Sequence, residues 1–183
     1  MKLINLRIAF IAILTSLTSS LLAQNEEMIL RCVAFYNLEN LFDTIHDEGK
    51  NDYEYLPDGG MKWTSFKYEQ KLDKMAYAIS QLGTDEDPRG AACIGVSEVE
   101  NIGCLHDLCK ELKDKYNRIY EPILLEGPDR RGVDVGFLYN PNMFKVVSIK
   151  KGSGGDPGEI RGTIIKQKNI GEVLKNTNFG VYG

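Results

Sequence analysis

The amino-acid sequence predicts a mixed fold of the α/β (α+β) class, large enough for about one domain. Strand-like apolar runs alternate with amphipathic helical stretches up to about residue 116, an order typical of α/β proteins. From about residue 119 onward, short strand-like segments are joined by turn residues instead. Of the 183 residues, 43% are hydrophobic and 26% are charged, which excludes a disordered or fibrous chain.

We expect residues 1–23 to form a secretory signal peptide. Two positively charged residues, Lys2 and Arg7, are followed by an apolar stretch that ends at the small residue Ala23. A polar segment begins at Gln24. The alternative is an uncleaved membrane anchor, but the apolar part is near the ~20-residue minimum for a span and contains several Ser and Thr residues. The sequence therefore predicts an exported protein, periplasmic or extracellular, without a stable membrane anchor.

The first strand is expected at residues 28–37, an apolar run that precedes a polar loop over 43–60. A helix should follow, with Thr64 or Ser65 as its cap and Gly83 at its end. Its apolar positions recur every three or four residues: Tyr68, Leu72, Met75, Ile79 and Leu82.

The second strand and helix repeat this order. Residues 91–96 form a continuous run of small apolar side chains, as in a strand that is buried on both faces. The helix after it is marked by apolar residues at helical spacing: Ile102, Leu105, Leu108, Leu112 and Tyr116.

The remaining segments are typical of an antiparallel meander. Strands are expected at 119–125, 133–139, 144–150 and 161–166, because each is apolar or alternating and is bounded by turn residues. The last six residues, 178–183, look like the start of another strand.

The four cysteines do not form a metal-binding pattern. Cys32, Cys93, Cys104 and Cys109 lack the CxxC or Cys/His spacing of a zinc site. We expect them to be small buried hydrophobic residues. A disulfide between Cys32 and Cys93 is the alternative if their two strands are neighbours.

Polar side chains follow both early strands, at the point where each apolar run ends. Asn37 follows the first run, and Glu98, Glu100 and Asn101 follow the second. If the strands are adjacent, these groups meet at one edge of the sheet, where α/β proteins bind ligands. Oxygen ligands of this kind suit Mg²⁺ or Mn²⁺. The alternative is that Asn37 and Glu98 cap the turn and helix that follow them.

Four segments in this order resemble the endonuclease/exonuclease/phosphatase superfamily, in its secreted bacterial branch. They are FYNLENLFD (35–43), YLPDGGMKWTSFKYEQKLDKMAYAI (55–79), IGVSEVEN (94–101) and PDRRGVDVGFLYNP (128–141). The resemblance implies a four-layer α/β/β/α sandwich of the deoxyribonuclease-like type with mixed sheets. It also implies metal-dependent hydrolysis of phosphoesters, with nucleic acid among the substrates of the superfamily.

The resemblance also implies roles for individual residues. Asn37 would hold the metal site and orient a phosphate, and Glu98 would be the principal ligand of Mg²⁺ (or Mn²⁺), so both are candidate catalytic residues. Glu100 is a weaker candidate ligand. Arg131 and Asp134 would lie on the substrate side, since arginine suits bidentate phosphate contacts. A solvated hairpin loop with Asp134 paired to an arginine is the alternative.

Later motifs of the superfamily, which supply a catalytic His and Asp pair, are absent from the sequence. The only histidines are His46 and His106, and neither lies in a matching motif. We therefore expect residues 24–183 to be the N-terminal part of the domain, an incomplete sandwich truncated at its C-terminus. As written, such a chain should be nearly inactive, because acid–base help is worth roughly 10²–10⁴-fold.

Two functions are consistent with these observations. The first is a metal-dependent phosphoester hydrolase of the endonuclease or phosphodiesterase type, present as its N-terminal half. The second is a non-catalytic secreted binding or scaffolding protein that retains half of the fold. The formal net charge of −4 argues against extended duplex binding by phosphate neutralisation alone. The sequence does not determine the oligomeric state or the substrate.

Overall fold

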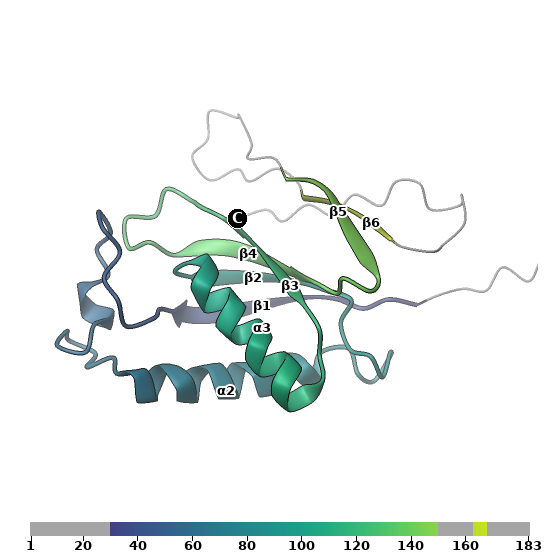
Figure 1. The fold of residues 1–183 in the computed structure, drawn as a ribbon, viewed down its shortest axis with the longest axis horizontal. Coiled ribbons are helices and arrows are strands. Elements are labelled where there is room, and N and C mark those ends of the chain that lie inside the picture. Colours follow the sequence, from purple (N-terminus) through teal and green to yellow (C-terminus); the bar gives the residue numbers. More distant parts are fainter. Residues whose placement is uncertain (1–29, 150–162, 168–183) are drawn as a thin grey trace, which may run out of the picture. The chain divides into compact units, whose positions relative to one another are not determined.

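The computed structural model describes residues 30–149 and 163–167 (Figure 1). The predicted signal peptide (1–23) and the predicted terminal strand (178–183) lie outside the described residues. Within the described ranges no helix combines the length and apolar character that crossing a membrane requires. The elements are β1 (Val33–Leu41), a 3-10 turn η1 (Tyr53–Tyr55), α2 (Ser65–Gln81), β2 (Cys93–Val99), α3 (Ile102–Tyr116), β3 (Glu121–Leu125), β4 (Asp134–Tyr139), β5 (Phe144–Ile149) and β6 (Thr163–Gln167).

Four strands form one mixed sheet in the order β1-β2-β4-β3. β1 and β2 are parallel, whereas β4 runs antiparallel to both β2 and β3. The predicted α/β class and mixed sheet are thus confirmed. The meander is only partly correct, because β5 pairs with β6 in a separate two-stranded sheet.

Both helices pack against one face of the four-stranded sheet, as Figure 1 shows. The expected spacing is confirmed for α2, where Tyr68, Leu72, Met75 and Ile79 are buried. Thr64 precedes α2 as its cap residue. The corresponding apolar positions of α3 are Leu105, Leu108 and Leu112, which are also buried.

The N-terminus of α3 is capped by Asn101. Its side-chain oxygen accepts a hydrogen bond from the backbone N–H of Cys104 at 3.1 Å. Such a cap satisfies a helix N–H that has no partner within the helix. Neither Glu98 nor Asn37 caps α3, but the capping alternative is correct in part, because Asn37 Oδ1 accepts a hydrogen bond from the Glu39 N–H in the turn that follows it.

The opposite face of the sheet carries a smaller apolar cluster. Phe137 and Tyr139 of β4 pack there with Cys93 and Phe144. Phe35 of β1 lies on the same face, because it pairs with Gly95 while the alternate residues of β1 point toward the helices. A Cβ atom on Gly95 would lie 2.8 Å from the Phe35 ring, so any larger residue there would displace this ring.

All four cysteines have free thiols. The prediction that they are buried is correct for Cys93, Cys104 and Cys109, whereas Cys32 is partly buried. β1 and β2 are neighbours, but Val33 rather than Cys32 pairs with Cys93. Cys32 therefore packs with the helix-side core and Cys93 with the opposite cluster. The two thiols lie on different faces of the sheet, which explains why no disulfide joins them.

Both parallel strands extend beyond their predicted ends. β1 continues to Leu41 and β2 to Val99, through the polar residues that the sequence analysis placed after the strands. Each strand contains an irregularity there, between Asn37 and Leu41 in β1 and between Ser97 and Val99 in β2. The candidate site therefore lies on bulged strand ends rather than in loops.

Candidate functional site

The carboxyl ends of β1 and β2 have an unusual backbone. Glu39, Asn40 and Glu98 adopt left-handed conformations, with φ angles of 49°, 61° and 59°. Residues other than glycine rarely adopt such angles, which cost of order 1–3 kcal/mol each. A bulge reorients the side chain at its position. Three such residues at adjacent strand ends mark this edge as a candidate functional site.

Asn37 and Glu98 meet at this edge. The Asn37 Nδ2 donates a hydrogen bond to Glu98 Oε1 at 3.1 Å. Asn37 Oδ1 accepts a bond from the backbone N–H of Glu39 at 2.7 Å, which fixes the amide plane. Asn37 is exposed and Glu98 is partly exposed. The carboxylate is thus oriented by one amide and remains accessible to a ligand.

A lysine from α2 lies beside the same strand ends. Lys71 Nζ donates hydrogen bonds to the backbone carbonyls of Glu39 and, at 3.0 Å, of Asn40. Burial lowers the pKa of Lys71, while the negative charges of Glu39 and Glu98 oppose this shift. The left-handed residues of β1 are therefore tied to a cation that also experiences the charge of Glu98.

A groove of about 440 Å³ runs along the outer side of α2 next to β1. Lys71 lines it together with Lys67 and Lys74, which recur at helical spacing. Tyr36 and Trp63 supply apolar surface. The Trp63 indole N–H donates to the Phe42 carbonyl at 2.9 Å, so the ring is held in place. The groove can contact anionic groups on one side and flat apolar groups on the other.

Tyr55, in the segment after β1, and Arg131, in the loop before β4, both interact electrostatically with Glu98. Tyr55 stacks on Phe42 with ring centroids 4.0 Å apart. Burial is the main cause that raises the pKa of Tyr55, and the charge of Glu98 adds to it while that of Arg131 opposes it. The two loops are joined by a hydrogen bond from the Asn51 N–H to the Arg130 carbonyl at 2.9 Å.

The predicted substrate-side residues have different environments. Arg131 is exposed, and its Nη2 lies 3.0 Å from Asp129 Oδ2. The bond to Asp129 is the main cause that raises the pKa of Arg131, and the negative charge of Glu98 adds to the shift. Asp134 is buried and accepts a hydrogen bond from the Gly127 N–H at 2.5 Å. Asp134 thus holds the loop before β4, and its role in substrate binding stays a prediction.

Glu100 lies only two residues from Glu98 but in a different environment. It is 5% exposed and accepts a hydrogen bond from the Asp43 N–H at 2.8 Å. Burial raises its pKa to about 8. Acidic and thiol atoms of Asp43, Glu100 and Cys104 lie within 4.8 Å of one another, so they form a second set of potential metal ligands.

The chemistry of the two donor sets favours Glu98 as the ligand of Mg²⁺ or Mn²⁺. Burial also raises the pKa of the Cys104 thiol to about 12, and the raised pKa values of Glu100 and Cys104 disfavour the ionised forms that bind metals. Protonated groups do not coordinate metals well. Mg²⁺ prefers one or two carboxylates with water and substrate phosphate, a set that an accessible Glu98 beside Asn37 can provide.

Among the described residues, neither histidine forms a hydrogen bond with Asn37 or Glu98. His46 is not simply exposed, since its Nδ1 is 2.5 Å from Oδ1 of the buried Asp52. Its ring also stacks on Tyr53. His106 is exposed on α3. The His46–Asp52 pair anchors the loop after β1, because Asp52 also accepts a bond from the Asp47 N–H at 2.8 Å.

Sequence reasoning missed Lys71 and Tyr55. The spacing of Lys67, Lys71 and Lys74 places three cations on one helix face and is visible in the sequence. The position of this helix face against β1 is not visible in the sequence, because helix periodicity does not show which strand end the helix approaches. Tyr55 gave no pattern signal at all.

Comparisons with known proteins identify the family of the chain. A search of curated proteins found no match. A family model described as "Endonuclease/Exonuclease/phosphatase family" matches residues 32–161, a range that contains β1, β2, both helices and β4. The match therefore covers Asn37, Glu98 and Arg131. Because it extends over more than half of the chain, the protein belongs to the endonuclease/exonuclease/phosphatase family.

Proposed function

We propose that this chain binds Mg²⁺ or Mn²⁺ through Glu98 and holds the phosphate of a phosphodiester against it. Family membership supports phosphoester hydrolysis as the class of reaction and dependence on a divalent metal. The observation that carries the proposal is the Asn37–Glu98 hydrogen bond at two bulged strand ends. The left-handed backbone of Glu98 has a cost that a purely structural carboxylate would not require.

The residues present fit such a metal. Among the described residues, Glu98 has Asn37 as its hydrogen-bond partner, so the carboxylate keeps capacity for a cation. When bound, a divalent metal polarises a phosphoryl oxygen and stabilises the negative charge that develops on it. Asn37 orients the carboxylate and can donate to a phosphate oxygen when Glu98 turns toward the metal.

The cations around Glu98 favour a phosphodiester substrate. Lys71 lies at the strand ends on one side, and Arg131 is electrostatically coupled to Glu98 on the other. The lysine groove along α2 can accept a chain of phosphates, as a nucleic acid would supply. We therefore propose nucleic acid as the first substrate to test, bound locally through this groove.

Turnover by the 183-residue polypeptide should be slow. A family hydrolase relies on a His and Asp pair for proton transfer, and the sequence lacks the motifs that carry it. His46 is already bonded to the buried Asp52. We propose that residues 1–183 bind metal and phosphodiester, and that without such a pair they hydrolyse it roughly 10²–10⁴-fold more slowly than with one.

The test combines binding with hydrolysis. Mn²⁺ should enhance the binding of a short single-stranded DNA by the purified chain, and EDTA should abolish this enhancement. Glu98→Gln should abolish it as well, whereas Glu86→Gln, an exposed control outside the site, should not. Metal-independent DNA binding that Glu98→Gln leaves unchanged would contradict the metal role. Fast EDTA-sensitive cleavage would contradict the predicted inactivity.

We further propose that the protein is exported. The composition of residues 1–23 supports this. Burial raises the pKa values of Cys93, Cys104 and Cys109 to about 12. Thiols of this kind react slowly, so they tolerate an oxidising compartment without forming disulfides. N-terminal sequencing of the secreted product should begin near Gln24, and a product found only in the cytoplasm would contradict export.

A further inference from the structure

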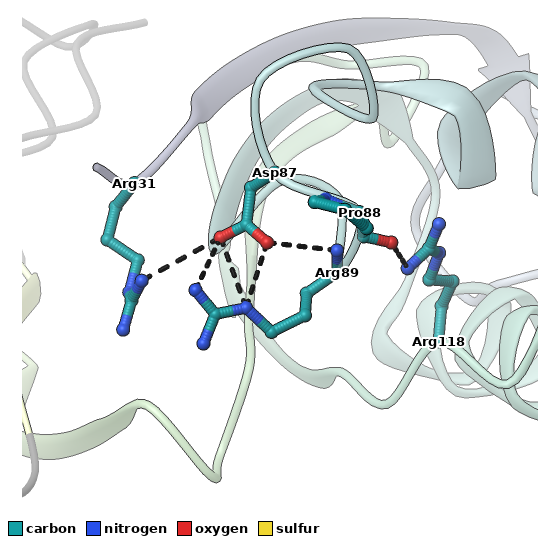
Figure 2. A network of polar contacts seen from close by, with 5 residues as sticks. All are labelled: Arg31, Asp87, Pro88, Arg89 and Arg118. Carbon is teal, nitrogen blue, oxygen red and sulfur yellow. Dashed lines mark hydrogen bonds and ion pairs between the residues drawn. The ribbon is translucent and has the colours of Figure 1, made fainter. Parts of the chain in front are cut away.

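A second polar site lies at the opposite ends of β1 and β2. A cavity of about 490 Å³ is lined there by Arg31, Arg89 and Arg118. Arg31 precedes β1, Arg89 lies in the loop before β2, and Arg118 follows α3, so the three guanidinium groups come from separate parts of the chain. Figure 2 shows them around Asp87 and Pro88. This arginine pocket takes no part in the function proposed above.

One buried carboxylate organises two of the arginines. Asp87 is 5% exposed, and both of its oxygens accept hydrogen bonds from Arg89, at 2.8 Å from Nε and 2.7 Å from Nη2. Arg31 Nη1 lies 3.7 Å from the same carboxylate. The side-chain bonds from Arg89 are the main cause that lowers the pKa of Asp87 to about 2. Asp87 therefore stays ionised and holds Arg31 and Arg89 in fixed positions.

Arg118 reaches the pocket from the other side without a carboxylate partner. Its Nη1 donates to the Pro88 carbonyl at 2.9 Å, as Figure 2 shows. Among the described residues no carboxylate lies within ion-pair distance of Arg118. Gly90, with a φ of 78°, lies next to this side chain, and a Cβ there would lie 3.4 Å from the guanidinium carbon. The charge of Arg118 is therefore held in place but not neutralised.

The pocket combines this positive charge with amide groups and apolar surface. Asp87 supplies one negative charge to two arginines, and Arg118 adds a third positive charge. Asn140 and Asn142 line the cavity, and Asn140 Oδ1 accepts a bond from the Asn142 N–H at 2.9 Å. Met143 contributes apolar surface. The volume is in the range of pockets that enclose small organic ligands.

We propose that the arginine pocket binds a small phosphorylated organic molecule, with Arg118 as its main charged contact. A guanidinium group presents a planar fork of donors that matches a phosphate group. The amides of Asn140 and Asn142 add neutral polar contacts, and the apolar lining accommodates the organic part. The unmatched charge of Arg118 attracts such an anion locally.

The test uses adenosine monophosphate as the probe, with the complete 183-residue chain in EDTA at low salt. Isothermal titration should give one site for adenosine monophosphate. Adenosine, which lacks the phosphate, and succinate, which offers carboxylates instead, should both bind at least about tenfold more weakly. Equal binding of adenosine would overturn the charged contact, and equal binding of succinate would overturn the preference for phosphate.

Two variants locate the binding. Arg118→Gln removes the unmatched charge, and Asn142→Asp adds a negative charge at an exposed position of nearly unchanged shape. Each should weaken binding at least about tenfold. Lys113→Gln removes an exposed charge of α3 that does not line the pocket, so its affinity should change less than about twofold. If Asn142→Asp and Arg118→Gln both fold and bind normally, the proposal is wrong.

The same titration separates this site from the strand ends at Glu98. Glu98→Gln should bind adenosine monophosphate in EDTA with unchanged affinity, because Glu98 lies at the carboxyl ends of the strands and the pocket at their amino ends. Loss of this binding in Glu98→Gln would place the anion at the metal site and overturn the arginine pocket.

Discussion

The two ends of the parallel β1–β2 pair use an acidic side chain in opposite ways. At the carboxyl ends, Glu98 is accessible, is bonded by a single amide and has a left-handed backbone. At the amino ends, Asp87 is buried and both of its oxygens are occupied by Arg89. A carboxylate with few partners can accept a cation, whereas a fully bonded one fixes the positions of its neighbours. The first end is therefore suited to a metal and the second to an anion.

The largest expected effect is on stability, at Asp87. The folded-state pKa of about 2 lies below the usual value of 3.8, so ionised Asp87 stabilises the fold above pH 3.8. This contribution is lost as the pH falls through 2. Because the Arg89 guanidinium is exposed and screened by water, only part of this shift, about 1–2 kcal/mol, is expected as stability.

Asp87→Asn should therefore lower the free energy of unfolding by about 1–2 kcal/mol at pH 7, and the difference should shrink between pH 4 and pH 2. Urea unfolding at several pH values measures both. Glu98→Gln is the matched comparison and should change stability by less than about 0.5 kcal/mol. A pH-independent loss in Asp87→Asn would mean that packing rather than the ion pairs fixes this loop.

The next effect concerns metal affinity, at Glu98. Glu98→Gln should weaken Mn²⁺ binding by about 10- to 100-fold, because the amide lacks the negative charge that binds the ion. Electron paramagnetic resonance of free Mn²⁺ measures this directly. Asp87→Asn should bind Mn²⁺ with an affinity within about twofold of the wild type, since Asp87 is fully occupied by arginine. The comparison between the two ends fails if Asp87→Asn loses the metal instead.

A smaller effect is expected at Lys71. Lys71→Gln should weaken the Mn²⁺-dependent binding of a short single-stranded DNA by about 3- to 10-fold, and the difference should decrease at high salt. Fluorescence anisotropy at two salt concentrations measures it. Lys110→Gln removes an exposed charge of α3 and is the control. Equal losses in both variants would indicate a diffuse charge effect and not a specific groove.

The smallest expected effect is a gain in stability. Asparagine tolerates left-handed backbone better than glutamate does, so Glu98→Asn should raise the free energy of unfolding by about 0.5–1 kcal/mol while metal binding is lost. Thermal unfolding in EDTA measures the gain. A lower melting temperature in Glu98→Asn would show that the Glu98 side chain stabilises the bulge, and the argument from backbone strain would then fail.

Much of the fold could be predicted from local patterns. The buried positions of α2 follow from helical spacing, and the β2 strand follows from a short apolar run. The pairing of β5 with β6 rather than with β4 could not be predicted, because short turns favour neighbouring strands but do not decide which sheet each strand joins.

The candidate site was predictable in part. Asn37 and Glu98 could be named because polar residues follow two apolar runs. The bulges could not be predicted, because these polar residues looked like loops in the sequence, whereas in the structure the strands continue through them. Asp87 and Arg89 lie in a segment, TDEDPRG, that looks like an ordinary polar loop. Their partners Arg31 and Arg118 are distant in the sequence.

The sequence by itself determined the order of the elements, the buried face of each helix and the family to which the chain belongs. These depend on residue type and spacing, which act locally. Only the tertiary structure decided that Glu98 faces Asn37 while Glu100 is buried, because a left-handed residue breaks the alternation of the strand. It also brought two arginines to the Asp87 carboxylate and a third, Arg118, to the neighbouring Pro88 carbonyl, an arrangement that exists only once distant segments pack side by side.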